Sequence, residues 1–385
     1  MTHRCSGMPR LWKGLLIWAV VLAAVNGIAW ISPALCDAYR LYVFHYISRV
    51  PMALTSPVSI PLGEVLAIIG AVLLFLVLPL SLLAGLCYKP WRRRLGWFWR
   101  RFIAWAVLIV MTLQTLNCFP LYHCTKLSEV YGASETATAE ELLDTYEKVV
   151  RQMAQQIGEL PRDPETGRPV LPADMDLNAE AAAAMGRLSD SHPELAGAYP
   201  VPKRFLCVKL FRYGGTIGLY YPYTMETTCS PLLTDSHLPV TLCHELAHTK
   251  GFLPEDEANF LAYLACIGSA DSMFRYSGYL FALEYLWDEV WKLDPDVYEE
   301  RINQIETMVP GDMWWDLYEY YPPEIREADE QADEAEQKLS EAVEQMNDTL
   351  TDASMKLNGV EDGIHSYDRV VQLMIAYYRD KDGDS

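Results

Sequence analysis

Three residues in the stretch LCHELAHTKG have the types and the spacing of a catalytic zinc site. His244 and His248 stand four positions apart, so on a helix they share one face and offer two nitrogens to one metal ion. Glu245 lies between them and points to the adjacent side, where a metal-bound water would sit. Zinc lowers the pKa of such a water, and a neighbouring carboxylate can take its proton and return it to a leaving amine. The pattern predicts Glu245 as the general base of a zinc-dependent hydrolase.

A third ligand is expected from the acidic stretch PEDEAN that follows. Gly251 comes three residues after His248 and suits a left-handed residue at the end of a helix. Pro254 and the acids behind it suit the first turn of a new helix. An antiparallel return of the chain would bring Glu255 or Glu257 near His248, and a water would complete a site with one zinc ion. The spacing leaves both glutamates as candidates.

A plain helical hairpin is the competing interpretation of this stretch. Its histidines would hydrogen-bond in the core, and PEDE would be only a favourable helix start. That interpretation explains any one of these residues taken alone. The joint pattern, with two histidines and Glu245 in an otherwise apolar segment, favours the metal site, because a buried carboxylate without a partner is costly.

The elements that must position these residues fall into two regions of opposite charge. Residues 1–118 contain 11 of the 31 Lys and Arg but 2 of the 51 Asp and Glu, which gives a formal charge of +9. The other 20 basic and 49 acidic residues give residues 119–385 a formal charge of −29. A region this acidic lacks the positive surface that phosphate binding requires, so we expect no nucleic acid partner.

Three apolar runs in the first region have the length of membrane-spanning helices. They cover residues 11–31, 60–86 and 102–119, and each reaches the roughly 17 to 25 residues that a helix needs to cross a bilayer. The first run could instead be a cleaved signal, because basic residues precede it, but its long apolar stretch favours an anchor. We expect residues 1–122 to form a membrane anchor with three transmembrane helices in the lipid bilayer.

Basic residues predict the orientation of this anchor. The short connection at residues 87–101 holds six Lys and Arg, whereas the longer loop at residues 32–59 holds two, and basic loops stay in the cytoplasm. We therefore expect a multi-pass protein of the cell membrane with a cytoplasmic N-terminus and an extracytoplasmic acidic region. The mixed pattern of CDAYRLYVFHYISRV in the longer loop suits a helix lying at the outer interface.

The acidic region is predicted to be mainly helical with a small sheet. Residues 133–160 combine a capping pattern with an amphipathic apolar stripe, and residues 324–350 predict a solvated helix. Residues 205–212 and 216–224, around Gly214 and Gly215, predict two antiparallel strands joined by a tight turn. The expected fold class is a membrane protein with three transmembrane helices and a mainly α (α+β) domain over residues 123–385.

Several stretches resemble one family of bacterial membrane proteins. HELAHTKGFLPEDEANFLAYLAC, the preceding GLYYPYTMETTCSPLLTDSHLPVTLC and the later MKLNGVEDGIHSYDRVVQLMIAYY are similar to the domain-of-unknown-function 3810 family, within the gluzincin-like metallopeptidases. The resemblance covers most of the chain. It implies a membrane-anchored, zinc-dependent peptidase with a mostly helical, zincin-like catalytic domain, and it brings no known substrate.

The resemblance also ranks the candidate ligands. In the wider gluzincin pattern HExxH is followed by ExxxD, whose Glu binds the metal and whose Asp supports a histidine. The matching positions here are Glu255 and Asn259, so the resemblance implies Glu255, ahead of Glu257, as the third ligand. Asn259 replaces the usual Asp and would hydrogen-bond a ligand.

Two further parts of a peptidase site have candidates in the sequence. The stretch TIGLYYPYTME is a candidate edge strand for aligning an extended substrate by main-chain hydrogen bonds. His365, Tyr367 and Arg369 in GIHSYDRVV are possible donors to the oxyanion of the reaction, although Tyr367 could simply pack and Arg369 could pair with an acid.

These observations together predict a membrane-anchored zinc metallopeptidase that cuts peptides or proteins near the outer membrane surface. Tethering would confine its site to a shell above the bilayer. Two alternatives stay open on the sequence. One is a non-hydrolytic zinc-binding membrane sensor or scaffold, for which Glu245 would have no use, and the other is a cell-wall amidase, which differs only in its substrate.

Overall fold

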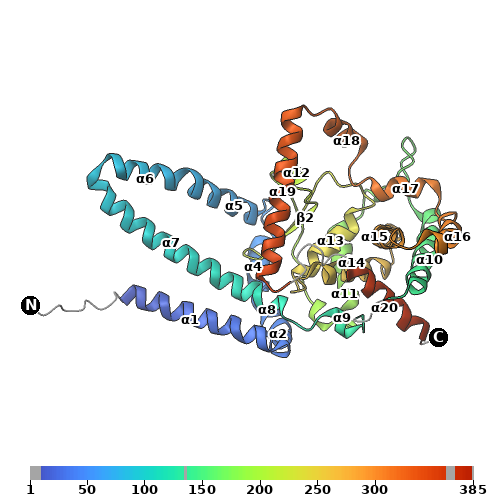
Figure 1. Cartoon of the computed structure of the whole chain (residues 1–385), viewed down its shortest axis with the longest axis horizontal. Coiled ribbons are helices and arrows are strands. Elements are labelled where there is room, and N and C mark those ends of the chain that lie inside the picture. Colours follow the sequence, from blue (N-terminus) through green and yellow to red (C-terminus); the bar gives the residue numbers. More distant parts are fainter. Residues whose placement is uncertain (1–9, 134–136, 361–368, 384–385) are drawn as a thin grey trace, which may run out of the picture.

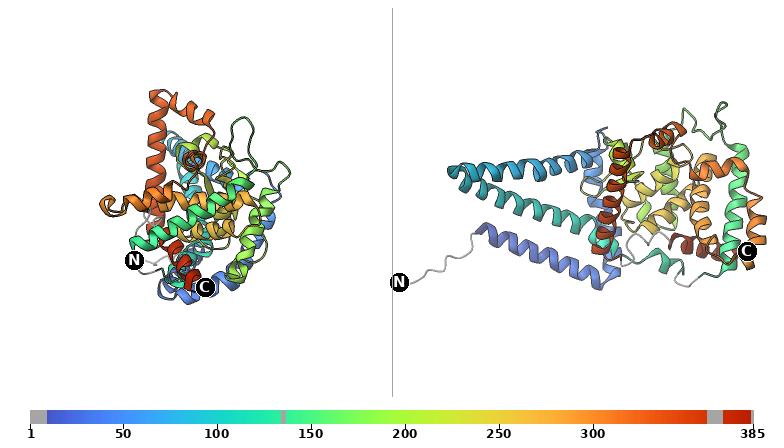
Figure 2. Two further views of the ribbon diagram at one scale, coloured as in Figure 1. Left: turned by 90° about the vertical axis from the view of Figure 1, so that its right-hand side faces the viewer. Right: turned by 45° about the horizontal axis from the view of Figure 1, so that its top comes forward.

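The computed structural model describes residues 10–133, 137–360 and 369–383. Three long helices extend from one side of a mostly helical body, which is the part of the chain that follows Asn117 (Figure 1). A second view shows the same separation, with the ends of the long helices meeting one side of the body (Figure 2). The two regions of opposite charge in the sequence thus occupy different parts of the molecule.

The three long helices confirm the expected membrane-spanning segments, since each is long and apolar enough to cross a bilayer. Their exposed surface consists largely of Leu, Ile, Val, Phe and Trp side chains, as expected where the surroundings are lipid. A π-helical turn interrupts the second span. The elements are α1 (Arg10–Ile31), then α5 (Leu62–Val72), η2 (Leu73–Val77) and α6 (Leu78–Cys87) in one continuous span, and α7 (Lys89–Asn117).

Four short helices between the first two spans form a belt at the base of the body, which is the side that the long helices meet. They are α2 (Pro33–Tyr39), the π-helical η1 (Arg40–Phe44), α3 (His45–Ile47) and α4 (Arg49–Thr55). One side of the belt joins a small apolar core formed by Phe44, Met52, Cys118, Leu121, Met225 and Leu253. The other side exposes apolar residues, namely Leu35, Tyr42, Val43, Tyr46, Val50 and Leu54. The belt is thus helical and two-sided, as an interfacial helix requires.

The core of the body is a stack of helices that pack on one another: α10 (Ala139–Gln156), α13 (Leu238–His248), α14 (Glu255–Ile267) and α15 (Ser272–Val290). The predicted capping pattern starts α10, because the Thr138 side chain accepts a hydrogen bond from the Glu141 backbone while the Glu141 carboxylate accepts one from the Thr138 backbone. Large aromatic side chains fill the interior, among them Tyr146, Phe260, Tyr263, Phe274 and Tyr276.

Shorter or more peripheral helices cover this core. They are α8 (Phe119–Tyr122), α9 (Leu127–Val130), η3 (Ile157–Glu159), α11 (Leu177–Arg187), η4 (Leu188–Asp190), η5 (Pro193–Leu195), α12 (Val208–Tyr213), α16 (Pro295–Glu306), α17 (Gly311–Tyr318), α18 (Pro323–Glu330), α19 (Glu334–Leu357) and α20 (Arg369–Gly383). The solvated helix predicted at residues 324–350 corresponds to α18 and α19, which carry few buried side chains.

The sheet has three short strands and is mixed, so the predicted purely antiparallel sheet is wrong. The strands are β1 (Lys203–Arg204), β2 (Gly218–Tyr221) and β3 (Glu226–Cys229), in the order β1-β3-β2. β2 and β3 form an antiparallel hairpin, whereas β1 pairs with β3 in parallel. β2 is therefore an edge strand of this sheet.

The strand predicted at residues 205–212 is also wrong, since most of it forms α12. Its alternating aromatic and β-branched residues fit a strand locally, but a contact with the membrane region favours a helix at this place. The Glu64 carboxylate of α5 accepts hydrogen bonds from the backbone N–H groups of Leu206 and of Cys207, the N-cap residue of α12. Gly215, at φ +66°, follows the end of this helix and is not the turn of a hairpin.

Candidate metal centre

A helical hairpin formed by α13 and α14 positions the candidate residues. α13 ends at His248, and Gly251 reverses the chain at φ +87°. A Cβ on Gly251 would lie 3.0 Å from the Leu121 side chain and 3.2 Å from that of Arg40, so the turn lies against the base of the body. α14 then begins at Glu255, directly after Pro254. The predicted glycine turn and acidic helix start are confirmed.

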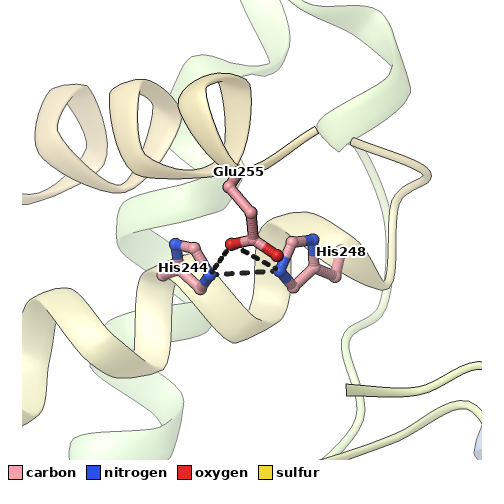
Figure 3. Close-up of side chains that lie close together, drawn as sticks. All are labelled: His244, His248 and Glu255. Carbon is pink, nitrogen blue, oxygen red and sulfur yellow. Dashed lines mark hydrogen bonds and ion pairs between the residues drawn. The ribbon is translucent and has the colours of Figure 1, made fainter. Parts of the chain in front are cut away.

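Three side chains of this hairpin converge (Figure 3). His244 and His248 on α13 face each other with their Nε2 atoms 3.1 Å apart. Glu255, on the first turn of α14, reaches between them, with Oε2 3.1 Å from His244 Nε2 and 3.7 Å from His248 Nε2. Three potential ligand atoms, one from each residue, therefore lie within 4.8 Å of one another.

Both imidazole rings have partners that hold them in place. His248 Nδ1 lies 2.8 Å from the Phe252 carbonyl oxygen, which leaves Nε2 as the nitrogen directed into the centre. Asn259, one turn further along α14 than Glu255, hydrogen-bonds His244 and donates its amide to the Tyr285 hydroxyl at 3.3 Å. Asn259 thus contacts one of the two histidines that the sequence predicts as ligands.

Two opposing effects determine the pKa values of the two histidines: burial disfavours a positive charge on the rings, and the negative charge of Glu255 favours it. Burial opposes a charge on His244, but the hydrogen bond to Glu255 outweighs it and raises the pKa of His244 to about 9. Burial lowers the pKa of His248 to about 4. Without a metal, His244 thus carries a proton and is the positive partner of Glu255. A metal cation bound among the three side chains would replace this proton as the partner of Glu255.

Glu245 lies beside this centre in a confined position. Its side chain is 4% exposed, and Oε2 has no hydrogen-bond partner among the residues that the structure describes. Burial, with a smaller contribution from Glu255, raises the pKa of Glu245 to about 8. The first residue of β2 covers it, because a Cβ on Gly218 would overlap Glu245 Oε1. Glu245 is therefore a buried carboxyl group aimed beside the three converging side chains, under an edge strand.

The donor set fits a zinc ion. Two imidazole nitrogens and one carboxylate are the ligands of many catalytic zinc sites, and they leave a coordination position open. His244 and Glu255 are partly exposed while His248 and Glu245 are buried, so the centre opens on the side of His244 and Glu255. The unpartnered oxygen of Glu245 is the kind of buried polar atom that a nearby cation or its water would satisfy.

Comparison with known proteins identifies the family of the chain. A family model described as "Protein of unknown function (DUF3810)" matches residues 39–375. The chain belongs to this family. The match spans most of the belt, the second and third membrane-spanning segments and the candidate centre. No curated protein and no solved structure matched the chain.

Other candidate residues of this DUF3810 protein lie away from the centre. Glu257 is buried on another side of α14, where its carboxylate accepts a hydrogen bond from the Leu127 backbone at 3.0 Å. Arg369 pairs with Asp256 at 3.0 Å. Of the two glutamates that the spacing allowed, the structure thus brings Glu255 and not Glu257 to the histidines. His365 and Tyr367 lie outside the described residues.

Three residues near the centre of this DUF3810 protein, two tyrosines and one glycine, were not predicted from the sequence. Tyr220 on β2 stacks on the His248 ring with centroids 6.0 Å apart, and Tyr285 on α15 meets Asn259. Gly218 covers Glu245. A glycine inside a strand pattern is a known sign of close backbone approach, so Gly218 was detectable, whereas nothing in the pattern of α15 distinguishes Tyr285.

Proposed function

We propose that this DUF3810 protein is a membrane-anchored, zinc-dependent peptidase with a zincin-like catalytic domain. The observation that carries the proposal is the convergence of His244, His248 and Glu255 beside the buried, unpartnered carboxyl of Glu245. An edge strand lies over that carboxyl at Gly218. A metal site, a base and a surface for aligning an extended chain are the three requirements of a metallopeptidase.

The side chains would divide the work as follows. His244, His248 and Glu255 hold the ion, and the Phe252 carbonyl and Asn259 keep the two rings oriented. A zinc ion held there would lower the pKa of a water molecule and polarise a substrate carbonyl. Glu245 takes a proton from the attacking water and passes it to the leaving nitrogen. The neighbouring positive charge would shift Glu245 toward its carboxylate form, as a base requires.

Hydrolysis explains Glu245 better than a structural role for the metal. A zinc-binding sensor or scaffold would close its coordination shell with protein ligands and would have no use for a buried carboxyl beside an open position. A cell-wall amidase would use the same groups on another amide, so only the products separate it from a peptidase. β2 favours a peptidase, because an edge strand recognises an extended main chain.

The test is the appearance of new peptide ends. The full-length protein in detergent, supplied with zinc, is incubated with a denatured protein mixture and with cell-wall fragments, and the products are followed by mass spectrometry. We expect new peptide termini with the wild type, none after chelation, and a decrease of at least about 100-fold in Glu245→Gln. Products from wall fragments alone would establish the amidase, and equal products from Glu245→Gln would refute both hydrolases.

A further inference from the structure

The hairpin of β2 and β3 rests on the end of the third membrane-spanning helix. Asn117, the last residue of α7, donates its side-chain amide to the Pro222 carbonyl oxygen at 2.7 Å. Tyr223 donates its hydroxyl to Gln114 of the same helix at 3.2 Å. β2 therefore runs from Gly218, beside Glu245, toward the surface of the bilayer.

The second span holds the same end of the hairpin. Glu226 of β3 accepts hydrogen bonds from the backbone of Leu62 at 3.1 Å and Gly63 at 2.7 Å, at the start of α5. A Cβ on Gly63 would overlap the ring of Tyr221, the last residue of β2. The membrane-facing end of β2 is thus fixed between the outer ends of two spans.

These contacts place the candidate centre close to the bilayer. From Gly218 to Pro222 the chain advances four residues, or about 14 Å at the rise of an extended strand. The belt, in which Tyr42, Tyr46 and Leu54 are exposed, lies where the long helices meet the body (Figure 1). Such exposed side chains suit the interfacial layer of the membrane, so the base of the body rests on lipid.

A chain that pairs with the free edge of β2 must follow the direction of this strand. Among the described residues, β2 pairs only with β3, so its other edge is open to another strand. Beyond Tyr221 an extended partner runs onto the ends of the spans and into the lipid. A soluble chain would have to turn away there, because unpaired main chain is costly inside a bilayer. A chain that emerges from the membrane, in contrast, already runs in this direction.

We propose that the substrates of this centre are polypeptides anchored in the same bilayer and cut in the segment that emerges from it. The proposal rests on the proposed peptidase function and adds a substrate class to it. The anchor is a transmembrane helix or an acyl chain, and about four to six extended residues separate it from the bond beside Glu245. Membrane tethering of both partners would raise their effective concentration at the site.

Site-specific photo-crosslinking tests this inference without requiring hydrolysis. Full-length Glu245→Gln in liposomes carries a benzophenone side chain at Thr216 or at Tyr223, on either side of β2. A third variant carries it at Tyr46, on the exposed side of the belt, as the control for mere proximity to the membrane. The probes are three pools of peptides with twelve degenerate residues, palmitoylated at the first residue, palmitoylated at the last residue, or free.

We expect one or both palmitoylated pools to be captured at least tenfold more than the free pool, at Thr216 and at Tyr223. Peptide residues captured at Tyr223 should lie nearer the acyl chain than those captured at Thr216, and Tyr46 should show no preferred position. Equal capture of the free pool, capture of the same positions at both sites, or no capture would overturn the inference. Hydrolysis of the same peptides by the wild type is measured in parallel. If the wild type releases no more product than Glu245→Gln, the peptidase function is refuted, whatever the capture pattern.

Discussion

A buried carboxyl group without a hydrogen-bond partner needs an explanation in its immediate surroundings. Glu245 has one such oxygen, Oε2, while its other oxygen, Oε1, lies against Gly218 of β2, and the carboxyl group is close to His244 and Glu255. Burying a polar group without compensation costs about 1–3 kcal/mol in proteins, so a purely structural role would favour an apolar side chain at this position. The proposed role of Glu245 as a general base would explain this cost, because a base must be held dry and close to the reacting atoms.

Replacing Gly218 by alanine tests the position of this carboxyl. The added Cβ would overlap Glu245 Oε1 and push the carboxyl from its place, while the three proposed metal ligands on α13 and α14 would stay where they are. We expect the rate of peptide hydrolysis to fall about 100-fold with the zinc content unchanged. Gly186→Ala on α11, where a Cβ would meet no atom within 4 Å, is the control and should keep full activity. An active Gly218→Ala would argue against the assigned position of the base.

Asn259 offers a second test among the single residues, because it supports His244 without being a ligand itself. Asn259→Leu removes the hydrogen bond, so we expect zinc affinity to fall about 10- to 100-fold, measured by competition with a chelator. Asn259→Asp, which keeps an acceptor at the same place, should bind zinc at least as tightly as the wild type. Unchanged affinity in Asn259→Leu would show that the contact with His244 is incidental.

Among the secondary-structure elements, the junction of β1, β3 and α5 couples the body to the membrane. Lys203 forms a buried ion pair with Glu226 and also donates to the Thr55 and Ile60 carbonyl oxygens. Glu226 in turn accepts from the first backbone N–H groups of α5. One buried pair thereby connects the sheet, the belt and the second span.

Lys203→Met should therefore destabilise the body strongly, because it leaves the Glu226 carboxylate buried without its cation. We expect a loss of about 3–5 kcal/mol in the free energy of unfolding, measured by pulse proteolysis in detergent over a denaturant series. The control is Lys209→Met, which removes the exposed pair with Glu336 and should leave the unfolding midpoint unchanged. If both variants unfold at the same midpoint, the buried pair is not what holds the junction together.

How far each element could be predicted depended on where its determining contacts lie. The spans, the capped α10 and the α13–α14 hairpin follow from patterns within a few residues, and the sequence predicted them correctly. α12 was mistaken for a strand because its start is satisfied by Glu64, more than a hundred residues away. The parallel pairing of β1 with β3 and the place of Tyr285 likewise depend on distant contacts that no local pattern records.

For the protein as a whole, the remaining prediction concerns orientation. The basic connection between α6 and α7 predicts that the body lies outside the cell. In intact cells, a membrane-impermeant maleimide should label Glu344→Cys on exposed α19, and should label the native, exposed Cys87 only after lysis. Site-resolved mass spectrometry reads both positions in one sample. Labelling of Cys87 and protection of residue 344 in intact cells would reverse the orientation.

The most direct test of the zinc peptidase proposal is the metal content of the purified full-length protein, measured by elemental mass spectrometry after exposure to zinc. The proposal predicts one zinc ion per chain in the wild type, a loss of the ion in His244→Ala and Glu255→Gln, and an unchanged content in Glu245→Gln and Glu257→Gln. The Glu257 variant is the matched control, since Glu257 lies on the same first turn of α14 but its carboxylate accepts from the Leu127 backbone, away from the histidines. A folded wild type that takes up no zinc would contradict the proposal, and the hairpin would then be only a structural element.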